Sequence, residues 1–221
     1  MSGFRLAVFD VDGTLTGVES CWRFVHERLG TWENGGKKNA ERFFRGEISY
    51  EDWAQMDAAL WKNVPVEKIR QIIAEIPLTE GIGEVFEFLG ENGVKIVLLS
   101  AGLSMLAERI VEKFHIDCYV ANELEVEDGK ITGKVKVKVS LSNKGEILEE
   151  ILRKFNVKHE ACLAVGDDET MIPVFQKVGL SIAFNPRNRQ VEKYAKVIVK
   201  SRDLKEIIPY IRRYMKCKSN V

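Results

Sequence analysis

Nine residues near the start of the chain, Leu6-Ala7-Val8-Phe9-Asp10-Val11-Asp12-Gly13-Thr14, decide the fold. The first four are apolar without interruption, which is typical of a central strand covered on both faces of a parallel sheet. The next part is acidic, and because Asp10 and Asp12 are two positions apart, their side chains share one face of an extended chain. Two close carboxylates repel each other unless a cation or a shared proton relieves them. The stretch therefore predicts a buried strand that ends in a polar, cation-binding site.

Short apolar runs and helix-like periodicity alternate from residue 94 onward, as in β-α-β units. Besides the strand at 6–9, we expect strands at 94–99, 162–165, 181–184 and 197–199. We expect helices at 103–114, 145–155, 172–178 and 204–214. Asp128-Gly129 between alternating residues predicts a β-hairpin over 125–131. The predicted fold class is α/β, a Rossmann-like, doubly wound and mainly parallel sheet with one small hairpin.

The segment from residue 16 to residue 78 interrupts this alternation. It contains all four tryptophans and has helix-like stretches at 19–29, 37–45, 50–60 and 66–76. We interpret it as a helical cap domain, residues 16–78, inserted after the first strand of a core formed by residues 1–15 and 79–221. Its aromatic residues are explained most simply as the core of a small helical bundle. An insertion at this place is also well positioned to close over a site.

Composition and charge narrow the classes of partner. The 221 residues include 33 Lys and Arg and 33 Asp and Glu, so no global basic field favours nucleic acid or an anionic membrane. No apolar stretch approaches the ~20 residues of a membrane span. The first apolar run is too short, and too acidic at its end, for a signal peptide. We therefore expect a cytoplasmic protein with a small-molecule partner, either a monomer or a homodimer.

Three further polar elements stand at the ends of predicted strands or at the start of a predicted helix: Ser100-Ala101, Lys144 and Gly166-Asp167-Asp168. Strand ends in an open parallel sheet converge on one crevice, so these residues can meet Asp10 there. An all-oxygen site of this kind favours Mg²⁺. A hydroxyl and the amides near a tight turn suit a phosphate. A lysine at a helix N-terminus is disfavoured by the helix dipole unless an anion lies beside it.

The four ordered elements resemble the motifs of the haloacid dehalogenase (HAD) superfamily, and most of the chain is similar to its phosphoserine-phosphatase-like branch. The resemblance implies a phosphomonoesterase in which Asp10 is the nucleophile and Asp12 is the general acid and base. It also implies that Asp10, the Asp12 carbonyl and Asp167 bind Mg²⁺, with Asp168 nearby. The phosphate would be bound by Ser100, Lys144 and the amides near Gly13 and Ala101.

The fourth motif departs from the family pattern. It reads Gly166-Asp167-Asp168-Glu169-Thr170-Met171, with Thr170 and Met171 where the family usually has Asn and Asp. Asp168, one residue early, is the candidate for the missing carboxylate. If Asp168 does not reach the metal waters, the expectation is weaker Mg²⁺ binding or lower activity. A non-catalytic binding or regulatory protein therefore stays open as an alternative.

The cap departs as well. Glu19 matches the position that handles the substrate amino group in phosphoserine phosphatases, but Asp57 aligns with the arginine that takes the substrate carboxylate. Reversing that charge should penalise phosphoserine, and Phe44, Tyr50 and Trp53 nearby suit an apolar, aromatic or sugar-like leaving group. The expected substrate is a small phosphorylated metabolite other than phosphoserine. A phosphotransferase or mutase would use the same motifs.

The other polar candidates receive structural interpretations. We assign none of the three histidines to chemistry. Arg187 and Arg189 follow a predicted strand end and could face the crevice, but we interpret both as part of a surface turn.

Overall fold

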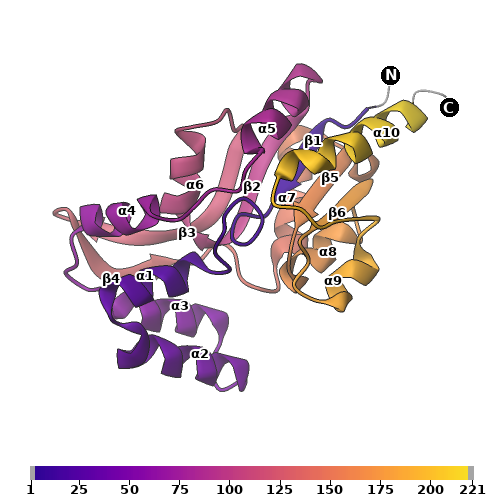
Figure 1. Ribbon diagram of the computed structural model, residues 1–221. Helices are drawn as coiled ribbons and strands as arrows, with labels where there is room; N and C mark the ends of the chain where they lie inside the picture. Colours follow the sequence, from indigo (N-terminus) through magenta and orange to yellow (C-terminus); the bar gives the residue numbers. More distant parts are fainter. Residues whose placement is uncertain (1–2, 219–221) are drawn as a thin grey trace.

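The computed structural model describes residues 3–218 as a seven-stranded sheet flanked by helices (Figure 1). The strand order is β4-β3-β2-β1-β5-β6-β7, and all neighbouring strands are parallel except the antiparallel pair β3 and β4. The strands are β1 (Leu6–Phe9), β2 (Lys95–Leu103), β3 (Cys118–Glu127), β4 (Lys130–Lys136), β5 (Cys162–Gly166), β6 (Leu180–Phe184) and β7 (Val197–Val199). The predicted α/β fold class is confirmed.

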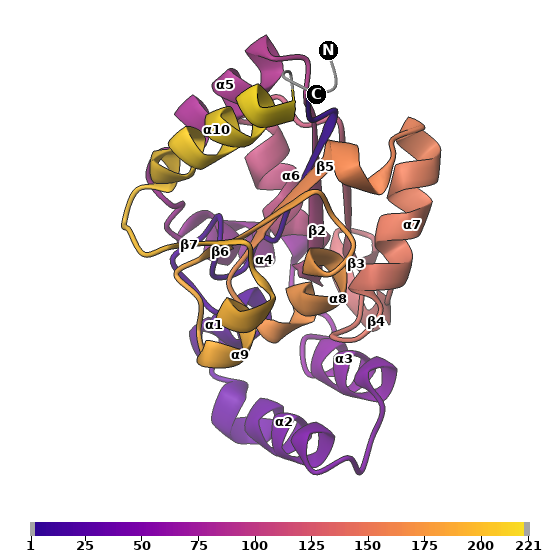
Figure 2. The same cartoon turned by 90° about the vertical axis from the view of Figure 1, so that its right-hand side faces the viewer.

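Both faces of the sheet are covered by helices, and Figure 2 shows the sheet between two helical layers. Ala7 and Phe9 of β1 belong to the core on one face, and Leu6 and Val8 to the core on the other, as the two-residue period of a strand requires. The first face carries α5 (Ile82–Glu91), α6 (Ser104–Val111) and α10 (Ile208–Lys218). The second carries α7 (Lys144–Phe155), α8 (Ile172–Phe175) and α9 (Arg189–Tyr194).

Four α-helices and a short π-helix (Trp32–Gly36) stand between β1 and α5. The α-helices are α1 (Cys21–Leu29), α2 (Lys37–Phe44), α3 (Tyr50–Ala59) and α4 (Val66–Ala74). Thr16 and Leu78 form an antiparallel bridge at the base of this insertion, which supports our proposal of a cap at residues 16–78. The aromatic residues do not form an isolated bundle core, because fully buried Trp61 lies in the same hydrophobic cluster as Phe9 of the sheet. The insertion therefore packs against the sheet, next to the carboxyl end of β1.

The predicted elements differ from the observed ones at several ends. β2 continues through Ser100 to Leu103, so the predicted strand-to-helix turn at Ser100 is part of the strand. β3 extends far beyond the predicted hairpin, and its acidic second half pairs only with β4. Helix α6 ends at Val111 and α8 at Phe175, earlier than predicted, and α9 was not predicted. In the described part of the chain, no helix has both the length and the apolar character needed to cross a membrane.

Candidate active site

Asp10 and Lys144 form a buried ion pair at the centre of the site. Asp10 follows β1 and is 3% exposed, and Lys144 is the first residue of α7 and is 1% exposed. Lys144 Nζ lies 2.8 Å from Asp10 Oδ2, and the Val11 backbone N–H donates to Asp10 Oδ1 at 2.8 Å. Burial raises the pKa of the Asp10 carboxyl, and the lysine charge offsets only part of that rise. A lysine at a helix N-terminus needs an adjacent anion, and Asp10 supplies it.

Asp12 is held by the first residue of the insertion's first helix. Its Oδ1 accepts the Cys21 backbone N–H at 2.7 Å, and its Oδ2 accepts the Ser100 hydroxyl at 3.4 Å. Burial, reinforced by the charge of Asp10, raises the pKa of Asp12 from 3.8 to about 6. A carboxyl that titrates there can give up or take a proton near neutral pH.

Asp167 lies at the end of β5, between a hydroxyl and a guanidinium. Thr14 Oγ1 donates to Asp167 Oδ1 at 3.0 Å, and Arg187 Nε lies 2.6 Å from Asp167 Oδ2. Burial and the Asp10 charge raise the pKa of Asp167 to about 7, although Arg187 opposes this. Gly13, at φ 76°, is required beside them, because a Cβ there would overlap Asp167 Oδ2 and lie 2.7 Å from Arg187 Nη2.

Arg187 lies in the predicted surface turn, but its side chain reaches the site, so it is a functional candidate that the sequence interpretation did not assign. Besides its ion pair with Asp167, its Nη2 donates to the Glu19 backbone carbonyl at 2.9 Å. It thereby joins the loop after β6 to the residue that precedes the Ser20 N-cap of α1. Its position just beyond a strand end was the signal that could have identified it. Arg189, by contrast, is exposed at the start of α9.

The departures in the fourth motif have different structural consequences. Asp168 Oδ1 accepts the Thr170 backbone N–H at 3.0 Å and the Thr170 hydroxyl at 2.5 Å, so the two residues cap the turn after β5. Met171 is fully buried in the core beneath α7, where it packs over Gly166. Asp168 and Thr170 line the cavity that lies between the carboxylates and the cap, and Met171 does not.

Cap side chains contact the main chain beyond Ser100. The Ala101 carbonyl accepts hydrogen bonds from Trp22 Nε1 at 3.2 Å, the Tyr50 hydroxyl at 2.7 Å and Asn122 Nδ2 at 2.8 Å. The Gly102 backbone N–H donates to Ser100 Oγ at 2.9 Å. The cap is therefore hydrogen-bonded to the segment for which the resemblance implies phosphate binding.

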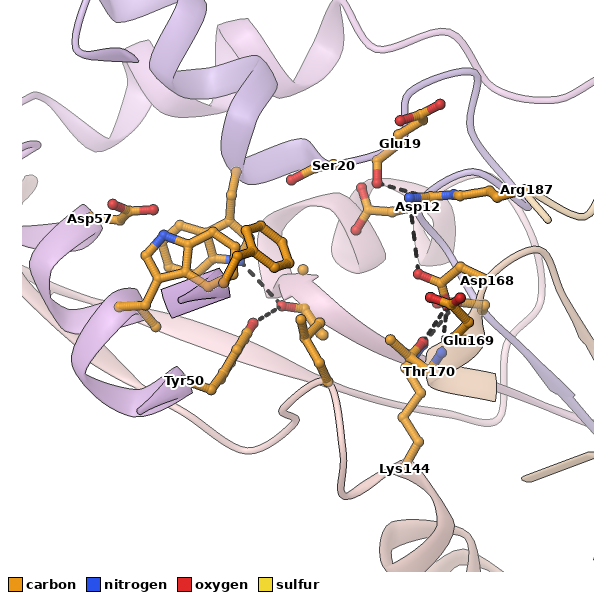
Figure 3. A pocket seen from close by; sticks show the side chains of 18 of the residues that line it. Asp12, Glu19, Ser20, Tyr50, Asp57, Lys144, Asp168, Glu169, Thr170 and Arg187 are labelled. Atoms are coloured by element: carbon orange, nitrogen blue, oxygen red, sulfur yellow. Dashed lines mark hydrogen bonds and ion pairs between the residues drawn. The ribbon is translucent and has the colours of Figure 1, made fainter. Parts of the chain in front are cut away.

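A cavity of about 310 Å³ runs from the carboxylates to the cap (Figure 3). It brings together most of the predicted site residues: Asp10, Asp12, Glu19, Phe44, Tyr50, Trp53, Asp57, Ala101, Lys144 and Asp168. Ser100 does not line it, and Gly13 and Asp167 line an adjoining cavity, with Arg187 and Glu19 bordering both. Asp57 is only 2% exposed: its Oδ1 accepts Asn39 Nδ2 at 2.8 Å and its Oδ2 lies 3.2 Å from His26 Nε2.

Comparisons with known proteins identify the family. The chain matches the family of haloacid dehalogenase-like hydrolases over residues 4–179. It is 36% identical to a phosphoserine phosphatase of Methanocaldococcus jannaschii, over 94% of this chain and 98% of that protein. The chain belongs to the haloacid dehalogenase-like hydrolase family. A second relative, the phosphoserine phosphatase of Archaeoglobus fulgidus, is 37% identical over 83% of this chain and 53% of its own length. A solved phospho-aspartyl intermediate analogue of phosphoserine phosphatase superposes with a TM-score of 0.80 at 32% identity, covering 94% of this chain and 99% of that one.

The donor set of this HAD-family phosphatase fits a hard divalent cation. Asp10 and Asp167 are both buried, and the charge of Asp10 raises the pKa of Asp167, so the pair carries negative charge that a cation would relieve. Within residues 3–218, no three acidic, histidine or cysteine side chains form a metal-binding group by themselves. The residues therefore fit a metal held by two carboxylates together with a backbone carbonyl and water, as Mg²⁺ commonly is.

Proposed function

We propose that the chain is a Mg²⁺-dependent phosphomonoester hydrolase that works through an aspartyl-phosphate on Asp10. One observation carries the proposal: Asp10 and Asp12 reach the same cavity as Lys144, and Lys144 Nζ lies 2.8 Å from the Asp10 carboxylate. An anionic nucleophile approaches a phosphate dianion only when positive charge offsets their repulsion. Lys144 supplies part of that charge, and Mg²⁺ held by Asp10, the Asp12 carbonyl and Asp167 would supply the rest.

The chemistry takes two steps on these side chains. In the first, a carboxylate oxygen of Asp10 attacks phosphorus, the bond to the leaving oxygen breaks, and protonated Asp12 donates its proton to that oxygen. In the second, Asp12 takes a proton from water, which attacks the phosphorus and releases phosphate and free Asp10. A pKa of about 6 lets Asp12 serve both steps near neutral pH.

Ser100 Oγ and the amides near Gly13 and Ala101 would hold the phosphoryl oxygens. Asp168 would stand in for the carboxylate that Met171 replaces, since Asp168 lines the cavity and its charge raises the pKa of Asp10.

For the substrate we propose a small phosphorylated metabolite other than phosphoserine. The relatives named phosphoserine phosphatases favour phosphoserine, but the arginine that the resemblance requires for its carboxylate is Asp57 here. That residue is buried against Asn39 and His26, so charge repulsion is not the main argument. The stronger one is that no basic side chain of the cap lines the cavity among the described residues. We keep the cytoplasm as the expected location and a monomer or homodimer as the expected assembly.

The test compares the wild type with Asp10→Asn on an aryl phosphate, with and without Mg²⁺. Asp128→Asn is the matched control, because Asp128 is exposed in the turn between β3 and β4 at φ 48°, which asparagine tolerates. We expect metal-dependent turnover that persists in Asp128→Asn and is lost at least about 1,000-fold in Asp10→Asn.

A phosphoryl adduct trapped on the peptide containing Asp10 of the wild-type protein would give the same answer without relying on the variant. Turnover that survives in folded Asp10→Asn would refute the proposed nucleophile. Transfer of the phosphoryl group to an added alcohol faster than to water would identify a phosphotransferase.

A further inference from the structure

The cavity of about 310 Å³ is lined at its cap end by aromatic side chains, which the catalytic chemistry does not require. Four aromatic residues line that end: Trp22, Phe44, Tyr50 and Trp53. A cavity of about 310 Å³ lies near the lower end of the range for small-molecule sites. Because a phosphoryl group occupies only the catalytic end, the aromatic end is the space left for the leaving group.

These aromatic side chains offer the cavity ring surface more than polar atoms. The Tyr50 hydroxyl and Trp22 Nε1 are both consumed by hydrogen bonds to the Ala101 carbonyl. Trp53 is stacked on Phe43, with ring centroids 4.7 Å apart and planes 23° apart, and its Nε1 is buried. The Tyr50 hydroxyl and Trp22 Nε1 are therefore not free to hold a charged leaving group, and the buried Trp53 Nε1 has no hydrogen-bond partner among the described residues.

The solvent exposure of Phe44 supports the same interpretation. It is 73% exposed, the largest exposed fraction among the big apolar side chains of the described residues, and it lines the cavity beside Trp53, with ring centroids 5.6 Å apart. Leaving a phenylalanine in water forfeits the free energy that its burial would yield. An apolar group in the cavity would recover part of it.

Charge at the cap end disfavours an anionic leaving group. Among the described residues, the basic lining side chains are Lys144 and Arg187, and each is paired with an acid of the catalytic end. A carboxylate placed at the cap end would lose water, and none of the described residues that line that end supplies a basic side chain to pair with it.

A cationic leaving group has weak support by comparison. Both carboxylate oxygens of Asp57 already face polar groups, Asn39 Nδ2 and His26 Nε2. Glu19 is exposed, and an ion pair in water contributes little. An uncharged apolar or aromatic body is the chemistry that the walls match.

We propose that the aromatic end selects a phosphomonoester whose leaving alcohol is uncharged and carries an apolar or aromatic body. The inference rests on the proposed hydrolase function. Phe44 and Trp53 would be specificity-determining residues, since they contact the leaving group and not the phosphoryl group.

The experiment compares four alkyl esters, so that the acidity of the leaving alcohol differs little: 2-phenylethyl phosphate, glycerol phosphate, phosphoethanolamine and phosphoserine. We expect kcat/KM for the phenylethyl ester to exceed that for phosphoserine at least about 10-fold, the size of a favourable aromatic contact. Phe44→Ala and Trp53→Leu should lower kcat/KM for the phenylethyl ester several-fold and leave that for glycerol phosphate nearly unchanged. Tyr210→Ala is the matched control, because Tyr210 is 41% exposed on α10, away from the cavity.

A binding measurement separates this inference from the proposed function. In Asp10→Asn, tryptophan fluorescence would follow titration with the same four esters without turnover. Tighter binding of the phenylethyl ester by Asp10→Asn would support the selectivity. If the wild-type protein also failed to hydrolyse all four esters, the hydrolase would be refuted while the selectivity stood. A preference for phosphoserine or phosphoethanolamine would overturn the selectivity, as would Phe44 and Trp53 variants that weaken all four esters equally.

Discussion

Replacing Arg187 with glutamine tests whether the guanidinium supplies the charge that Asp167 needs when no metal is bound. The change removes the 2.6 Å ion pair to Asp167 and the 2.9 Å hydrogen bond to the Glu19 carbonyl. Hydrogen bonds to charged groups contribute roughly 1.5–3 kcal/mol each. Because the Arg187 side chain is 28% exposed, we take a total loss of about 2 kcal/mol. For a chain of this size that lowers Tm by about 4–8 °C.

Mg²⁺ makes this prediction specific. If metal and guanidinium offset the same negative charge, saturating Mg²⁺ should at least halve the fall in Tm of Arg187→Gln. The assay is thermal unfolding followed by circular dichroism with and without Mg²⁺. Arg189→Gln serves as control, since Arg189 is exposed at the start of α9 and its variant should unfold like the wild type. An equal fall in Tm with and without Mg²⁺ would refute the idea that Mg²⁺ and Arg187 offset the same negative charge. Arg187 would then have only a structural role.

Two further predictions concern the titration of buried carboxyls. Asp12→Asn should lower kcat at least about 100-fold on an alkyl phosphate, whose leaving oxygen needs a proton, and should leave a stoichiometric burst on an aryl phosphate, whose leaving group needs none. Rapid-quench kinetics checks both results. For the wild type, kcat/KM on the alkyl ester should fall above about pH 6 as Asp12 loses its proton. Without Mg²⁺, Asp12 and Asp167 bind more protons in the folded protein than in the unfolded chain between pH 4 and 7, because their pKa values are raised to about 6 and about 7. These two groups should therefore lower stability across that range, by about 3 kcal/mol from Asp12 alone. Other acids with lowered pKa values oppose this only near the acidic end, so urea unfolding between pH 5 and 7 would contradict the prediction if stability rose.

The sheet and its catalytic edge could be predicted because both follow from local rules. Uninterrupted apolar runs identify strands covered on both faces, and β1 and β7 have the predicted bounds. Parallel strands deliver their carboxyl ends to one edge, so Asp10 and Asp168 reach the same cavity although they come from different strands. The ends of β2 and β3 were mispredicted, since polar residues inside both strands resemble turn residues.

The cap contacts could not be predicted because they depend on pairs distant in sequence. Helical periodicity places Asp57 on α3, but it does not reveal that His26 and Asn39 on two other helices meet its carboxylate. Arg187 presents a similar problem. Its position after a strand end indicated the edge of the sheet. The direction of its long side chain, in a Pro-containing turn, could not be predicted, because it is set by the ion pair with Asp167.

The fourth motif connects these observations. Met171 stands where the resemblance implies an Asp, and it fills the core over Gly166. Asp168 is our proposed substitute for that carboxylate; its Oδ1 accepts hydrogen bonds from Thr170, and its Oδ2 lies 4.0 Å from Arg187 Nη1. Arg187 therefore faces both acids of the motif while it contacts the cap through Glu19. Any cation that draws Asp167 away from Arg187 would alter a contact between core and cap, so the charge balance of the site and the seating of the cap are physically linked.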